Sequence, residues 1–267
     1  MSDDVVLVET RGPIWRATLN RPEVRNAFDE RVIAALTAWA REVARAADAG
    51  DVRVAVIAGA GKTFSAGADL NWMQRMRDYS REDNVRDAEA ASTLFAALDA
   101  LPVPLVGRIQ GAALGGGAGL AAVCDLVVAA DDAQFGFTEV RLGILPAVIS
   151  PFVVAKIGPS AARALFLAGS RFPAPLAHRL GLVHEVVPAT ELDAALEVVV
   201  QDLLLGAPSA HRRTKALLRA IAGKPPADAE VRALTASALA DQRVSADGQD
   251  GLAAFLEKRS PRWTREE

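Results

Sequence analysis

Two short segments carry small residues at places where the backbone could bind a ligand directly. Residues 64–70 read Phe-Ser-Ala-Gly-Ala-Asp-Leu, and residues 115–117 are three consecutive glycines. Small side chains let backbone N–H groups approach a ligand closely, and a helix N-terminus adds N–H donors that lack partners. Two such segments facing each other could form an oxyanion hole, which stabilises a developing negative charge. Either segment alone is more typical of a tight turn with close strand–helix packing.

Each segment follows a run of residues that predicts a strand. Val52–Ala58 and Leu105–Ile109 are the two runs, and the three glycines are expected to open a helix. The other expected strands are Val5–Glu9, Trp15–Leu19, Asp125–Ala130 and, as the one late strand, His184–Val187. The expected helices run from an N-cap at Asp29 to about Ala47, and over Asp87–Asp99.

This order of elements predicts an α/β fold with a helical C-terminal portion. Strands and helices alternate through the first half of the chain, whereas helical patterns dominate the last part. We therefore expect an α/β core over residues 1–190 and a helical region over residues 191–267. The length of 267 residues and the hydrophobic content of 51% are ample for a packed core and exclude a disordered chain.

Charge and cysteine content limit the partners and the compartment. The net charge of −3 argues against a nucleic-acid-binding protein. The uncharged stretch between Arg108 and Asp125 is shorter than the roughly 20 residues that a membrane-spanning helix needs, so we expect no membrane partner. Cys124 is the only cysteine, and the first residues lack the pattern of a signal peptide. Together these features predict a cytoplasmic protein.

The sequence predicts no metal site and no separate cofactor. The tripeptide Gly61-Lys62-Thr63 resembles part of a phosphate-binding loop, but Val56 stands where that motif requires a glycine. The three histidines, His178, His184 and His211, show no zinc-ligand spacing.

Several further motifs give the sequence a resemblance to a known family. They are Asn20-Arg21-Pro22, Arg25-Asn26-Ala27, residues 134–139 (Gln-Phe-Gly-Phe-Thr-Glu), residues 142–146 (Leu-Gly-Ile-Leu-Pro) and residues 250–259. With the two glycine-containing segments, they resemble the crotonase (enoyl-CoA hydratase/isomerase) superfamily over nearly the whole chain. The resemblance implies a spiral of ββα turns with a helical C-terminal region that supports a homotrimer, or a hexamer made from two trimers. It also implies an acyl-CoA thioester substrate, so that coenzyme A enters as part of the substrate.

The resemblance also assigns residues to the site. The backbone N–H groups of Ala68 and Gly116 would form the oxyanion hole for the thioester oxygen. Other positions match residues that contact the substrate or line the CoA path: Arg25, Ala27, Ala66, Asp69, Leu70 and Gly115. Phe255 and Lys258 match residues that reach CoA from the C-terminal helix, often of a neighbouring subunit. Adding water to an unsaturated thioester pushes charge onto the carbonyl oxygen, which two preplaced N–H donors can stabilise.

The carboxylates are the point at which this sequence departs from the family pattern. Well-characterised hydratases of the superfamily use two glutamates, and here the aligned positions are Gly119 and Glu139. Hydration needs a base that activates water and an acid that protonates the α-carbon, so Glu139 would have to serve both steps, or another group must assist. Residues 64–73, 115–120 and 139–151 are most similar to bacterial hydratases for 3-methylglutaconyl-CoA and isohexenylglutaconyl-CoA.

The substrates of that narrower group carry a second carboxylate, which would require a cationic partner in an apolar pocket. The candidates are Arg75, Arg77 and Arg141, although a surface ion pair is the more ordinary role of an arginine. Two other functions stay open: an enoyl-CoA isomerase in which Glu139 shuttles one proton, and an acyl-CoA binder without catalytic activity.

Overall fold

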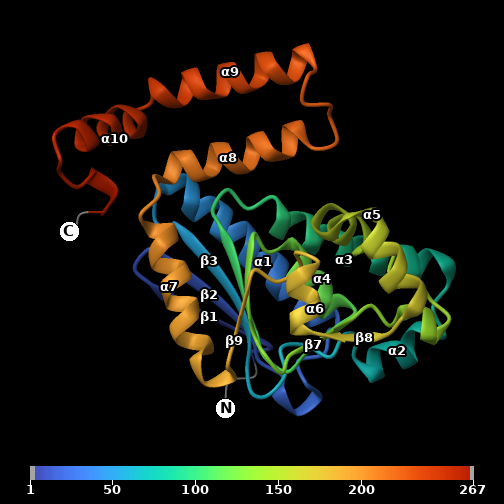
Figure 1. Ribbon diagram of the computed structural model, residues 1–267. Coiled ribbons are helices and arrows are strands. Elements are labelled where there is room, and N and C mark those ends of the chain that lie inside the picture. Colours follow the sequence, from blue (N-terminus) through green and yellow to red (C-terminus); the bar gives the residue numbers. More distant parts are fainter. Residues whose placement is uncertain (1–3, 265–267) are drawn as a thin grey trace. The chain divides into compact units, whose positions relative to one another are not determined.

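The chain divides into two compact units, Met1–Val198 and Val199–Glu267. A computed structural model describes residues 4–264 of them (Figure 1). The first unit contains every strand of the described residues, and the second unit is helical.

The strands form two sheets. Their bounds are β1 (Val6–Arg11), β2 (Ile14–Leu19), β3 (Val54–Gly59), β4 (Leu105–Ile109), β5 (Ala112–Leu114), β6 (Leu126–Ala130), β7 (Gln134–Gly136), β8 (Arg171–Pro173) and β9 (Glu185–Val187). The larger sheet has the order β1-β2-β3-β4-β6-β9, in which β1 is antiparallel to β2 and the other pairs are parallel. The smaller sheet has the order β5-β7-β8, with β5 parallel and β8 antiparallel to β7.

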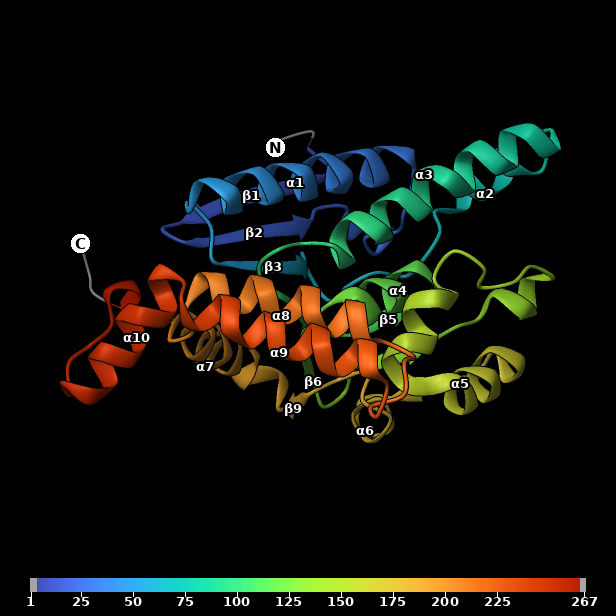
Figure 2. The same cartoon turned by 90° about the horizontal axis from the view of Figure 1, so that it is seen from above.

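Helices of the first unit cover and connect these sheets. They are α1 (Glu30–Ala49), α2 (Leu70–Met76), α3 (Arg81–Asp99), α4 (Gly116–Val123), α5 (Ser150–Ala168), α6 (Ala174–Arg179) and the start of α7 (Leu192–Leu204). Short 3₁₀ helices are η1 (Pro22–Val24), η2 (Glu139–Leu142) and η3 (Ala189–Glu191). Figure 2 shows α1 lying along β1 and β2 and beside α3.

The first long helix shows how the sequence sets an element. Asp29 caps α1 by accepting hydrogen bonds from the N–H groups of Arg31 and Val32, and Gly50 ends the helix with φ of 89°. The residues that face the core recur at helical spacing: Val32, Ile33, Leu36, Trp39, Ala40 and Val43. The predicted N-cap at Asp29 is therefore confirmed.

The second unit consists of the end of α7 followed by α8 (Pro208–Ile221), α9 (Ala229–Arg243), α10 (Ala246–Leu256) and η4 (Arg262–Thr264). Asp247, in the first turn of α10, accepts a hydrogen bond from the backbone N–H of Ser209 at 3.0 Å, which ties α10 to the start of α8. Side chains that face outward from α10 include Phe255, which is 83% exposed.

Several predicted elements need correction. Helix α3 begins at Arg81 rather than Asp87, because Ser80 and Asp83 form a capping box ahead of it. His184–Val187 is not the one late strand, since β8 at Arg171–Pro173 is also a strand. Strands β5, β7 and β8 have three residues each and contain or adjoin glycine or proline, which is why the sequence did not reveal them.

Helix α5 has the length and mean hydropathy, 1.2, of a membrane-spanning segment. Its helix is interrupted, because Gly158 has φ of 76° and ψ of 161° and is followed by Pro159. The absence of a membrane partner stays a prediction.

Candidate active site

The segment Ser65–Asp69 is held on both sides by neighbouring backbone. On one side, the N–H of Ser65 donates to Ala112 O at 2.9 Å, and the N–H of Leu114 donates to Ser65 O at 3.0 Å. On the other side, the N–H of Phe28 donates to Gly67 O at 2.7 Å, and the N–H of Asp69 donates to Phe28 O at 2.8 Å. The peptide that contains the Ala68 N–H lies between these anchors and is fixed by them.

Gly115 brings the second glycine segment next to the first. Its φ of 52° and ψ of −119° form the sharp turn from β5 into α4. An ideal β-carbon on Gly115 would lie 3.9 Å from the Gly67 Cα atom and 3.3 Å from Oε1 of Glu139. The two predicted segments and the predicted catalytic glutamate therefore meet at one place in the first unit.

Parallel pairing of β5 with β7 explains this meeting. The register places Leu114 beside Gly136 at the C-terminal ends of the two strands, and the N–H of Gly115 donates to Gly136 O at 2.8 Å. Residues that follow neighbouring parallel strands lie at the same edge of a sheet. Glu139 opens η2 three residues after β7 ends, so its carboxyl group reaches Gly115.

Burial without a partner shifts the pKa of Glu139. Its Oε2 is buried and accepts no hydrogen bond from the described residues. Burial raises the pKa of this carboxyl group above the ordinary value for glutamic acid, although the backbone N–H of Glu139 itself acts in the opposite direction. A half-buried carboxyl group with a raised pKa returns a proton more readily at a given pH than an exposed one, which suits a general acid–base group.

The amides of Ala68 and Gly116 are available as donors. Neither N–H group donates a hydrogen bond to another described residue. Ala68 is exposed, and Gly116 is the first residue of α4, where helix N–H groups lack intrahelical partners. The ring of Phe28 lies 3.5 Å from an ideal β-carbon on Gly116, so it packs beside the start of α4.

A glutamate side chain at Gly119 would collide with side chains packed against α4. A β-carbon on Gly119 would overlap Cγ2 of Ile149 and lie 3.1 Å from Cε1 of Phe95. Ile149 is 3% exposed and Phe95 is 4% exposed, so both side chains are packed in the core. The apolar side chains of Ile149 and Phe95 therefore fill the space beside Gly119.

The residues predicted along the CoA path divide into buried and exposed ones. Ala27 and Asp69 are buried, Ala66 is half-buried, and Arg25 and Leu70 are exposed, Leu70 at 76%. The N–H of Ala66 donates to Arg25 O at 3.0 Å, so these residues are neighbours of the Ser65–Asp69 segment. Arg25 has φ of 56° as the C-cap of η1.

Phe255 and Lys258 belong to the second unit. Phe255 projects from α10, and Lys258 follows the helix with φ of 56° and an exposed side chain. Their role toward coenzyme A stays a prediction.

The three arginines considered for a substrate carboxylate have different surroundings. Arg75 donates to both carboxylate oxygens of Glu30 at 2.7 Å, and Arg141 donates to Oγ of Ser170 at 3.0 Å. Arg77, at the end of α2, is exposed and makes no side-chain hydrogen bond or ion pair within residues 4–264.

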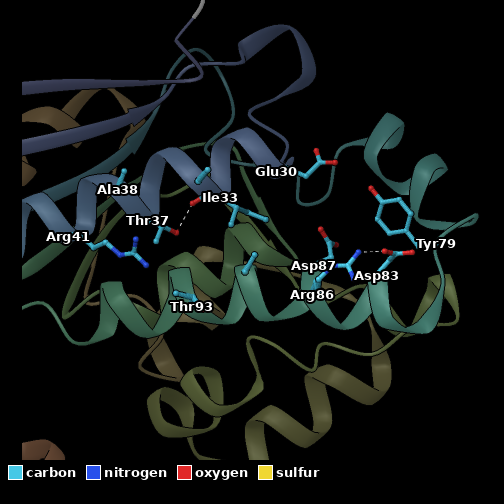
Figure 3. Close-up of a pocket in the computed structure, with 12 residues that line it drawn as sticks. Glu30, Ile33, Thr37, Ala38, Arg41, Tyr79, Asp83, Arg86, Asp87 and Thr93 are labelled. Atoms are coloured by element: carbon cyan, nitrogen blue, oxygen red, sulfur yellow. Dashed lines mark hydrogen bonds and ion pairs between the residues drawn. The ribbon is translucent and has the colours of Figure 1, made fainter.

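A cleft of about 750 Å³ lies elsewhere in the first unit, between α1 and α3 (Figure 3). Arg41 lies at one end of it, and Glu30, Asp83 and Asp87 lie toward the other. None of the predicted site residues lines this cleft. The candidate catalytic groups therefore lie at the glycine segments and Glu139, not in the cleft between α1 and α3. In the part of the chain that is described, no three His, Cys, Asp or Glu side chains are grouped as a metal site would require.

Sequence reasoning missed the residues that hold the site together. Asn26 is 1% exposed, and its Nδ2 donates to Ala60 O at 2.8 Å and to Thr63 O at 2.7 Å. Oγ of Ser65 donates to Asn26 O at 2.9 Å. Asn26 has φ of 54°, which asparagine tolerates better than most residues, and this tolerance was the available signal.

Two unpaired amides beside one half-buried acid can hold an enolate and move one proton to or from it. Enolates of this kind form from acyl thioesters, so the arrangement at the ends of these parallel strands suits an enzyme that acts on acyl thioesters. The profile of the enoyl-CoA hydratase/isomerase family matches residues 9–266.

Relatives of known name cover almost the whole chain. The 2,3-dehydroadipyl-CoA hydratase of Escherichia coli is 33% identical over 267 residues, which cover 96% of this chain and 97% of that protein. The crystal structure of an enoyl-CoA hydratase from Shewanella pealeana superposes with a TM-score of 0.92 at 36% identity, covering 97% of this chain and 96% of the other. The structure of Pseudomonas aeruginosa AtuE gives a TM-score of 0.91 at 39% identity, covering 98% and 100%.

The chain belongs to the enoyl-CoA hydratase/isomerase family, and it has the crotonase fold. It is an enzyme of the enoyl-CoA hydratase type.

Proposed function

We propose that this enzyme adds water to a branched enoyl-CoA whose acyl chain ends in a carboxylate, such as 3-methylglutaconyl-CoA, with Glu139 as its single catalytic carboxyl group. The observation that carries the proposal is the contrast between Gly115, the N-cap of α4, and Gly119 within the helix. Oε1 of Glu139 lies beside Gly115, whereas Ile149 and Phe95 fill the space beside Gly119. One acid must then take a proton from water and return it to carbon.

The reaction follows from that arrangement. Glu139 as carboxylate accepts a proton from water while the water oxygen bonds to the β-carbon. The electron pair of the double bond moves onto the thioester oxygen, which accepts hydrogen bonds from the N–H groups of Ala68 and Gly116. Protonated Glu139 then gives the same proton to the α-carbon, and the thioester carbonyl reforms. Water is consumed, and the carboxylate returns to its starting state.

A carboxylated acyl chain is supported by one relative. The E. coli protein is named for 2,3-dehydroadipyl-CoA, whose acyl chain is that of a dicarboxylic acid. Arg75 is already neutralised by Glu30, which leaves Arg77 and Arg141 as partners for a substrate carboxylate. Replacing each with glutamine should lower kcat/KM for 3-methylglutaconyl-CoA more than for crotonyl-CoA if that residue is the partner.

A panel of unsaturated acyl-CoA thioesters tests the proposal. Hydration removes the enoyl absorbance and adds the mass of water, whereas isomerisation leaves the mass unchanged. We expect hydration, with the highest kcat/KM for the branched, carboxylated substrate. A product of unchanged mass would favour the isomerase, in which Glu139 shuttles one proton. Binding of every thioester without turnover would favour the acyl-CoA binder.

We infer a homotrimer, or a hexamer of two trimers, in the cytoplasm. Exposed apolar side chains on α10, Leu252, Phe255 and Leu256, support an assembled state, because such patches on soluble proteins mark interaction sites. Light scattering coupled to gel filtration gives the subunit number, and a monomeric mass would contradict the inference. We also expect full activity after dialysis against a chelator, since the proposed steps use only Glu139, two backbone amides and water.

A further inference from the structure

A buried arginine joins the two segments that orient the Ala68 amide. Nη2 of Arg21 donates to Oδ2 of Asp69 at 2.8 Å, and Nη1 donates to Ala27 O at 2.7 Å. Nη1 also lies 3.2 Å from Oδ2 of Asp29. The Arg21 side chain is 11% exposed, so these contacts are shielded from water.

Each aspartate bound by Arg21 caps a helix. Oδ1 of Asp29 accepts from the N–H of Val32 at 3.0 Å at the start of α1, and Oδ1 of Asp69 accepts from the N–H of Asn71 at 2.8 Å at the start of α2. Burial opposes ionisation of Asp69, but its hydrogen bonds from the Trp72 N–H and Arg21 outweigh burial, so its pKa lies below the ordinary value. Arg21 therefore pairs with both capping carboxylates, and Arg31 pairs with Asp29 as well.

The same guanidinium brackets the Ala68 peptide. Ala27 directly precedes Phe28, and Asp69 directly follows Ala68, in the two segments that pair as a short parallel bridge. Phe28 uses its N–H and its carbonyl to bind Gly67 and Asp69, so the Ala68 N–H points to the opposite side by strand alternation. Rotation of that peptide would require Asp69 to move relative to Ala27, which the Arg21 bridge resists.

We propose that Arg21 is a positioning residue for the oxyanion hole, and that it holds the Ala68 N–H toward the thioester oxygen by clamping Asp69 to Ala27. This role rests on the proposed function of the Ala68 amide. Lysine cannot replace arginine here, because one ammonium group does not span three acceptors with the fixed fork of a guanidinium. Small displacements of a preorganised donor reduce catalysis strongly.

The test measures carbonyl polarisation directly. A conjugated aryl-acryloyl-CoA absorbs at longer wavelength when hydrogen bonds polarise its thioester carbonyl, so the red shift on binding reports the oxyanion hole. In Arg21→Lys we expect most of the red shift to be lost, with kcat lower by about 10- to 100-fold and KM changed by less than about 3-fold. The matched control is Arg31→Gln, since Arg31 also pairs with Asp29 but makes no bond to Asp69, and its side chain is 65% exposed. It should retain the red shift and kcat.

A second pair of variants keeps the proposal testable if Arg21→Lys does not fold. Asp69→Asn and Asp29→Asn each keep a capping oxygen and weaken one arm of the clamp. Only the first arm adjoins Ala68, so Asp69→Asn should reduce the red shift and Asp29→Asn should not. Equal red shifts in folded Arg21→Lys and wild-type protein would overturn the role of Arg21. Equal red shifts in the two aspartate variants would do the same, and neither result would contradict the proposed oxyanion hole. A wild-type protein that binds the probe without any red shift would instead contradict the proposed oxyanion hole.

Discussion

Ile149 occupies the space into which a side chain at Gly119 would extend. A β-carbon at position 119 would lie 3.0 Å from Cβ of Ile149 and would overlap its Cγ2 atom. The absence of a carboxylate at Gly119 is therefore matched by packing, because a core residue from the start of α5 fills the site. This packing supports the proposal that the enzyme uses one catalytic acid.

Restoring a glutamate at that position should harm the protein. We expect Gly119→Glu to lower stability by about 1–3 kcal/mol through overpacking, without a gain in hydration rate. Adding Ile149→Ala should recover part of this loss, because it removes the overlapping methyl groups. Thermal denaturation of both single variants and the double variant measures the coupling. Additive losses of stability would contradict direct contact between the two positions.

Glu139→Gln should remove catalysis and keep binding. The amide is nearly isosteric but cannot take a proton from water, so kcat should fall by about 10²–10⁴-fold. The affinity for a saturated acyl-CoA, measured by calorimetry, should change little, because thioester and CoA contacts do not depend on this group. Unaltered turnover together with weakened binding would reverse the assignment.

The pH profile of hydration should reflect the raised pKa of Glu139. The carboxylate is the form that activates water, so kcat/KM falls as the pH is lowered through the pKa of the free enzyme. Burial shifts that acid limb to higher pH than an ordinary glutamic acid, about 4.3, would give. Initial rates over a pH series locate the limb. A limb at or below the ordinary value would contradict the buried, unpartnered state of Oε2.

Gly116 allows one donor of the proposed oxyanion hole to be deleted. Proline is tolerated at the first position of a helix and lacks an N–H group. Gly116→Pro should therefore lower kcat by about 100-fold or more. Gly116→Ala is the matched variant, because its β-carbon would make an ordinary contact of 3.5 Å with Phe28 and it keeps the N–H. Gly116→Val, with two further methyl groups against the ring, should lower kcat at least as strongly as Gly116→Pro. Wild-type rates in the proline variant would exclude this amide from the site.

His184 should make the fold sensitive to acid. Partial burial of the ring, aided by Lys156, lowers the pKa of His184 to about 4. Its Nδ1 accepts a hydrogen bond from the Val127 N–H at 2.9 Å, which a protonated ring cannot do. The lowered pKa means that this stabilisation is present above about pH 6.5 and is lost as the pH falls toward 4. Urea denaturation at several pH values should show a loss of about 1 kcal/mol that is absent in His184→Asn, whose amide oxygen accepts without titrating. The same loss in both proteins would exclude His184 as its source.

The local sequence determined the regular elements and the pieces of the site. Apolar runs predicted β3 and β4, Asp29 marked the start of α1, and the glycines at 115–117 marked a turn into a helix. Each of these features depends on a few adjacent residues, so a short stretch of sequence contains the whole signal. The family motifs added which atoms to expect at the site.

Only the tertiary structure decided how those pieces meet. Pairing of β5 with β7 brings Glu139 to Gly115, Ile149 fills the space beside Gly119, and Arg21 reaches Asp69 across 48 positions. Strands of three residues leave no periodic signal, and contacts between distant residues have no pattern in either segment alone. Their geometry is set by the packing of the whole unit, which is why the burial of Glu139 and its raised pKa emerge only from the fold.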